Sequence, residues 1–197
     1  MLGKWFFALS LACLSGQASA HALGTDPTLI ERLEAGATLP AELASTWSVW
    51  FIFALMAAQN LSRVGFLFSG LALGVLLGAL TWSLAAIAPA ILLVILLLCA
   101  LWMTWGRETQ GLVSGVLIGV VSLMALNVLL QAHAELADDM LIRFMAALFT
   151  VVGASFCAGL VKQLATWLPR QAPIAVRILS SWMVALLAIQ LAAGTLS

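Results

Sequence analysis

The sequence predicts an all-α membrane protein, a polytopic bundle of six transmembrane helices that follows a cleaved signal peptide. Hydrophobic residues make up 64% of its 197 residues, and its mean hydropathy is +1.15. A soluble domain of this size cannot bury so much apolar side chain. Long apolar runs alternate with short polar breaks. The net charge is zero, which excludes the basic surface that nucleic-acid binding requires.

Residues 1–20 have the three parts of a secretory signal. Lys4 gives the positive start, an apolar core follows, and the polar stretch SGQASA ends the segment. Ala18 and Ala20 satisfy the small-x-small cleavage rule, so we expect His21 to be the mature N-terminus. The alternative is that the segment stays attached as an uncleaved first helix.

Residues 21–42 are predicted to form a short periplasmic segment. Within it, Thr28–Glu34 can form a helix with Asp26 as its N-cap. We expect Gly36 to end this helix, because glycine is common just past a helix C-terminus. Pro40 then marks the entry to the membrane.

Six apolar runs make up the predicted membrane domain, residues 43–197. Each run is close to the roughly 20 residues needed to cross the hydrocarbon core. The break near Pro89 carries no charge, but a single helix across it would have about 40 residues, too many to match a bilayer. We place the helices at 43–60, 63–84, 86–105, 111–131, 140–166 and 174–194.

The charged residues predict which side of the membrane each loop faces. With the mature N-terminus outside, the inner loops are mainly basic and the outer segments mainly acidic. This is the positive-inside pattern of a bacterial inner-membrane protein, so we expect both mature termini in the periplasm. The inner residues are Arg63, Arg107, Lys162, Arg170 and Arg177 with Glu108, and the outer residues are Asp26, Glu31, Glu34, Glu42, Glu135, Asp138 and Asp139 with Arg32 and Arg143.

Glycines recur at every fourth residue in two of the predicted helices. Each set lies along one helix face, and both helices run from inside to outside, so they are parallel. Without Cβ atoms, two backbones can approach closely in lipid. We interpret the ladders as packing within the bundle, with a homodimer face or a close-packed pair that lines a transport pathway as alternatives. The residues are Gly70, Gly74 and Gly78 in one helix and Gly111, Gly115 and Gly119 in the other.

Reactive side chains are almost absent from the predicted membrane interior. No acidic residue or histidine lies at a predicted midplane, which argues against a proton-relay pump and against a haem protein. The chain has only two histidines, so no Ser-His-Asp set can be assembled, and we predict that the protein is not an enzyme. Cys99 and Cys157 lie in apolar runs without CxxC spacing, which disfavours a disulfide or a thiolate metal site.

The stretch QAHAELADD, at the outer end of the predicted helix 111–131, gathers potential cation ligands. His133 and Glu135 can converge in a turn, and Asp138 either joins them or caps the next helix. Imidazole and carboxylate suit a divalent transition metal such as nickel, cobalt or zinc. The alternative is an ordinary polar turn between two helices.

Two further groups extend this hypothetical metal site. Asn127 and Gln131 lie one above the other on the helix and lead inward from the turn. A free amino terminus at His21 can chelate a metal together with His133. Cleavage two residues earlier leaves Ser-Ala-His, which favours copper or nickel.

The layout resembles that of the HupE/UreJ family. The first helix ends in LMAAQ, similar to the family's WAAQ, and His133 and Glu135 look like part of its HGxxHGxE stretch. The family's first-helix motif HPxxGxDH has no counterpart in STWSVWFIFALMAAQ, and the later motif is reduced to QAHAEL. The resemblance implies nickel or cobalt uptake for hydrogenase and urease maturation, with His133 and Glu135 as the residues carried over.

We therefore expect a divalent-metal permease or a metal-delivery accessory protein in the inner membrane, surrounded by lipid. In this hypothesis His133 and Glu135 capture the ion, and Gln131 and Asn127 pass it inward between the glycine-bearing helices. The alternative is a non-transporting subunit that stabilises a larger membrane complex. Besides lipid, the expected partners are further copies of the chain or the other subunits of such a complex.

Overall fold

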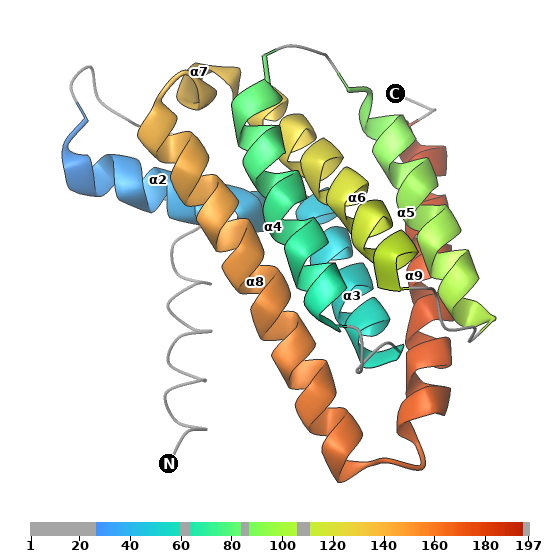
Figure 1. The fold of residues 1–197 in the computed structure, drawn as a ribbon. Helices are drawn as coiled ribbons and strands as arrows, with labels where there is room; N and C mark the ends of the chain where they lie inside the picture. Colours follow the sequence, from blue (N-terminus) through green and yellow to red (C-terminus); the bar gives the residue numbers. More distant parts are fainter. Residues whose placement is uncertain (1–26, 60–63, 84–86, 106–110, 195–197) are drawn as a thin grey trace.

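The computed structural model describes residues 27–59, 64–83, 87–105 and 111–194, and all regular secondary structure in these ranges is helical (Figure 1). The all-α prediction is therefore confirmed for this part of the chain. Several residues used in the predictions lie outside it: the signal segment 1–20, His21, Asp26, Arg63, Arg107 and Glu108.

Each of the six apolar runs forms a helix close to its predicted bounds. Four of these helices are long and apolar enough to cross a membrane, or five spans can be counted if α2 (Leu29–Glu42) and α3 form one bent span. α5 is apolar but has only 16 residues, because Pro89 starts it in the first turn that proline tolerates. The six are α3 (Ala44–Gln59), α4 (Val64–Thr81), α5 (Pro89–Thr104), α6 (Gly111–Ala132), α8 (Met140–Trp167) and α9 (Ala172–Gly194).

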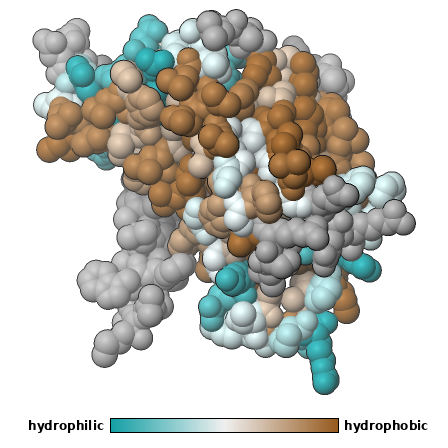
Figure 2. All heavy atoms as spheres, in the orientation of Figure 1, coloured by the Kyte–Doolittle hydropathy of each residue, from teal (hydrophilic) through white to brown (hydrophobic). Residues whose placement is uncertain are grey.

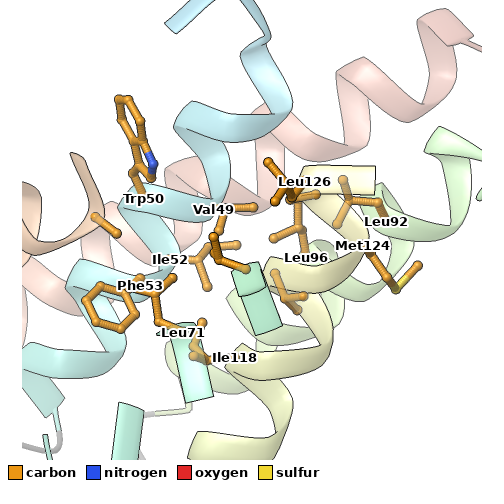
Figure 3. Packing of buried hydrophobic residues seen from close by; sticks show 14 of the residues in the cluster. Val49, Trp50, Ile52, Phe53, Leu71, Leu92, Leu96, Ile118, Met124 and Leu126 are labelled. Carbon is orange, nitrogen blue, oxygen red and sulfur yellow. The ribbon is translucent and has the colours of Figure 1, made fainter. Parts of the chain in front are cut away.

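Successive long helices run in alternating directions, so α4 and α6 are parallel neighbours (Figure 1). α5 packs mainly on α9, while α2 and α3 pack on α8. The core lies where α3, α4 and α6 meet: Figure 3 shows Phe53, Leu71 and Ile118 converging from these three helices. All three side chains are fully buried.

The short helix α7 (Ala134–Ala137) marks one end of the bundle, which we call the α7 end. The connection from α6 to α8 lies there, and it carries Glu135, Asp138 and Asp139. Lys162, Arg170 and Arg177 lie at the opposite end, on the last turns of α8, in the loop after it and on the first turns of α9. Acidic residues therefore predominate at the α7 end of the described chain, and basic residues lie at the opposite end.

The segment before α3 is a longer helix than the sequence predicts. Thr28 is the N-cap of α2: its hydroxyl accepts a hydrogen bond from the Glu31 N–H at 3.3 Å. The Glu31 carboxylate accepts one in return from the Thr28 N–H at 2.6 Å, which completes a capping box. These two bonds satisfy amides that the start of a helix leaves unpaired, and they replace the predicted role of Asp26.

Gly36 does not end the helix, so this prediction is wrong. The residue is buried inside α2, where a Cβ atom would lie 2.6 Å from Met145 Cβ and 2.7 Å from the Ile142 carbonyl oxygen of α8. The glycine thus permits close approach between helices rather than a stop. α2 ends instead at Glu42, two residues after Pro40, and the chain bends by 72° into α3.

Candidate functional site

His133, the centre of the predicted metal site, lies where α6 gives way to α7. Its backbone (φ −125°, ψ 48°) leaves the helical region and ends α6. The imidazole Nε2 lies 3.7 Å from the Glu42 Oε2 at the end of α2, and each of the two side chains is 19% exposed. The imidazole therefore meets a carboxylate from the α2–α3 elbow, a residue that the sequence analysis did not include among the ligands.

The other predicted carboxylates do not join His133. Glu135, in the single turn of α7, is exposed, and so is Asp138. Within the described ranges, no group of three or more His, Cys, Asp or Glu side chains is placed to hold a metal ion. Asp138 does not cap α8 either. That role belongs to Asp139, whose carboxylate accepts a hydrogen bond from the Leu141 N–H at 2.8 Å.

Asn127 and Gln131 bridge α6 to its neighbours. Asn127 is 1% exposed, and its side-chain amide donates to the carbonyl oxygens of Leu123 at 3.0 Å and Gly78 at 3.4 Å. Gln131 accepts a hydrogen bond from the Ile87 N–H, just before α5, at 3.2 Å. Both amides are thus used to hold α4 and the start of α5 against α6.

The two glycine ladders face each other in the structure. A Cβ atom on Gly70 would overlap the Gly115 carbonyl group, and one on Gly74 would overlap that of Gly119. The next contact is between Gly78 and Leu123. The glycines of α6 are therefore displaced by one helical turn relative to those of α4. Gly111, the first residue of α6, is buried. The backbones meet directly, which leaves no room for an ion between these helices at this contact.

Two arginines that were not predicted as site residues connect neighbouring helices at the α7 end. The Arg32 guanidinium forms an ion pair with Asp139 at 3.3 Å, which joins α2 to the start of α8. Arg143 donates to the Ala79 carbonyl oxygen at 3.5 Å and lies over the Trp82 ring at 5.9 Å. A positive charge there interacts favourably with the negative C-terminal end of α4. These contacts tie α2 and α4 to α8 at the end of the bundle where His133 also lies.

An apolar groove of about 680 Å³ runs between α5 and α6. Its walls include Leu98, Trp102 and Val116, and Gln59 contributes an amide side chain. The Gln59 amide nitrogen donates to the Met103 carbonyl oxygen at 3.0 Å. Among the described residues, no acidic side chain or histidine lines this groove, so this part of the chain does not extend the predicted metal site into it.

Comparison of the chain with protein-family models, with curated proteins and with solved structures gives no match. The resemblance to HupE/UreJ proteins therefore stays a prediction from the residues quoted above.

Proposed function

We propose that the protein is a membrane-embedded accessory protein that binds a divalent transition metal of the nickel or cobalt type at its α7 end. The observation that carries this proposal is the His133–Glu42 pair. Imidazole and carboxylate are ligands that such ions accept, and here they come from helices far apart in the sequence. With two protein ligands, the other coordination positions of the metal are left to water or to a delivering molecule. A protein that passes its metal to another protein needs such exchangeable positions.

The geometry favours metal delivery over permeation between α4 and α6. Asn127 and Gln131, the predicted inward relay, are engaged in hydrogen bonds to neighbouring backbone. The glycine contact brings the two backbones together. An ion on this route would have to break both features, and neither α4 nor α6 carries a charged side chain that would replace its lost hydration.

We further propose that all six apolar helices cross the bacterial inner membrane with the α7 end in the periplasm. The basic residues at the opposite end, Lys162, Arg170 and Arg177, support this orientation through the positive-inside rule. α5 has 16 residues, as many as α3, and Trp102 and Trp105 at its end are suited to the membrane interface. The signal-like start of the sequence agrees with export of the N-terminus.

Metal content and nickel titration of the detergent-purified protein test the binding proposal. We expect the wild type to bind nickel, and His133→Ala and Glu42→Gln each to weaken this binding by about tenfold or more, since each removes a ligand. Glu34→Gln is the matched control, because it removes an exposed carboxylate from the same helix. A wild type that binds no nickel, or equal affinities in all four proteins, would contradict the proposal.

The second candidate function is that of a non-transporting subunit of a larger membrane complex. It is favoured by the use of Asn127, Gln131 and the glycine ladders for packing rather than transport. The same purified sample distinguishes the two functions. Metal-free protein in a complex of fixed composition supports the subunit, whereas a single species that binds nickel through His133 supports the accessory protein.

A further inference from the structure

α2 has three chemically different sides. Successive residues of a helix are turned by about 100°, so residues three and four apart share a side. One side is buried against the bundle and includes Gly36 and Leu39. The second is polar and carries Glu31, Glu34, Thr38 and Glu42. The third side is apolar and is only partly covered by the described chain: Leu29 and Ile30 are exposed, and Leu33 and Ala37 are partly exposed.

The ionic contacts of α2 show which way these sides face. Glu42, on the polar side, reaches His133 at the α7 end. Arg32, which shares the buried side with Gly36 and Leu39, reaches Asp139 at the start of α8. The polar side therefore faces the α7 end. The apolar side faces the other way, along α8 toward its C-terminus. Figure 2 shows hydrophilic residues along the upper edge above α2 and hydrophobic residues below them.

The exposed apolar side chains are large. Leu29 is 65% and Ile30 73% exposed, and α8, on which α2 packs, also exposes apolar side chains farther along, where Leu148 is 53% and Val152 50% exposed. In a protein with this hydropathy, that surface of α8 lies in lipid. Trp47, at the elbow after α2, is 41% exposed and donates to the Ala41 carbonyl oxygen at 2.8 Å. Half-exposed tryptophan of this kind favours the boundary between acyl chains and headgroups.

We propose that α2 lies in the plane of the membrane as an interfacial helix, with Leu29, Ile30, Leu33 and Ala37 immersed in the outer leaflet. Its partner is the phospholipid surface itself. An amphipathic helix in this position buries its apolar side about 5–10 Å below the headgroups. The 72° bend into α3 is then the point where the chain turns from the membrane surface into the bilayer. This inference is independent of metal binding.

Depth-dependent fluorescence quenching tests the position of α2. Single cysteines would be introduced as Leu29→Cys and Ile30→Cys on the apolar side, with Glu34→Cys and Thr38→Cys as matched controls on the polar side. The background would carry Cys13→Ala, Cys99→Ala and Cys157→Ala. Each variant would be labelled with an environment-sensitive fluorophore and placed in phosphatidylcholine vesicles with brominated acyl chains.

We expect at least twofold stronger quenching at positions 29 and 30 than at positions 34 and 38. Equal quenching at all four positions, whether strong or absent, would overturn the proposal, because the helix would then span the bilayer or lie in water. Weak quenching together with a disulfide between two copies of the Ile30→Cys variant would also overturn it and would assign the apolar side to a second copy. All four positions lie on a described helix outside the buried side, so the labels do not disturb the core.

Discussion

At the scale of single residues, the missing Cβ atoms of four glycines determine how the bundle packs. Gly70 and Gly74 of α4 meet Gly115 and Gly119 of α6 backbone to backbone. In lipid there is little hydrophobic drive between helices, so this close contact contributes through dispersion. A single added carbon would have to push the two backbones apart, since a carbonyl group cannot rotate away as a side chain can.

Gly70→Ala should lower the stability of the protein by about 1–3 kcal/mol, the usual cost of overpacking. Gly159→Ala is the control, because no described atom outside the neighbouring backbone of its own helix lies within 4 Å of its added Cβ. That variant should leave stability unchanged or raise it by up to about 1 kcal/mol through helix propensity. Thermal and denaturant unfolding in the same detergent measures both. Equal stabilities for the two variants would contradict the close contact of α4 and α6.

At the scale of elements, α2 depends on local bonds at its start. The Glu31 carboxylate accepts hydrogen bonds from the N–H and hydroxyl of Thr28, and these bonds lower its pKa. A group with a lowered pKa in the folded state stabilises the fold above its ordinary pKa. This stabilisation is lost as the pH falls through the lowered value.

The first turn of α2 should therefore fray in acid, as the pH falls below the ordinary pKa of glutamate and the Glu31 carboxyl gains its proton. Hydrogen exchange of the α2 amides, corrected for the intrinsic effect of pH, measures this fraying. Glu31→Gln should have a weaker first turn at neutral pH and no acid-dependent change. If the wild-type amides stay equally protected from neutral pH to pH 2, the capping box does not hold the helix.

The six apolar helices could be predicted because hydropathy and charge alone define them, as the predicted 111–131 and the observed Gly111–Ala132 show. The contact between His133 and Glu42 could not be predicted from the sequence, because it depends on the angle between α2 and α3. The role of Asn127 could not be predicted from the sequence either. A polar stripe at the end of a helix looks the same whether it binds an ion or, as here, the backbone of the next helix.

At the scale of the whole molecule, the alternating helix directions give a specific expectation for the number of crossings. α8 has 28 residues and lies between Ala134 and Gln171, so it serves as a reference crossing. α5 has 16 residues and lies between Ser83 and Trp105. If both helices span the membrane, the residues on either side of each must face opposite compartments.

Labelling of single cysteines with a membrane-impermeant reagent, in oriented inverted vesicles and in spheroplasts, tests whether α5 and α8 each cross the membrane. The two variants Ala134→Cys and Gln171→Cys should react from opposite sides, and so should Ser83→Cys and Trp105→Cys. Ser83→Cys should share the side of Ala134→Cys. If Ser83→Cys and Trp105→Cys react from one side while the α8 pair does not, α5 fails to cross and the six-span arrangement is wrong.

The unequal helix lengths have a consequence for the membrane around the protein. At 1.5 Å per residue, α8 is about 42 Å long and α5 only about 24 Å, against a hydrocarbon core of about 30 Å. A six-span protein would thin the bilayer beside α5, while α8 tilts or projects into the headgroups. The bilayer would then be thinner on one side of each molecule, beside α5. When two molecules bring these thinned regions together, the lipid is deformed once instead of twice. The elastic energy of the lipid would therefore draw the molecules together without any contact between side chains.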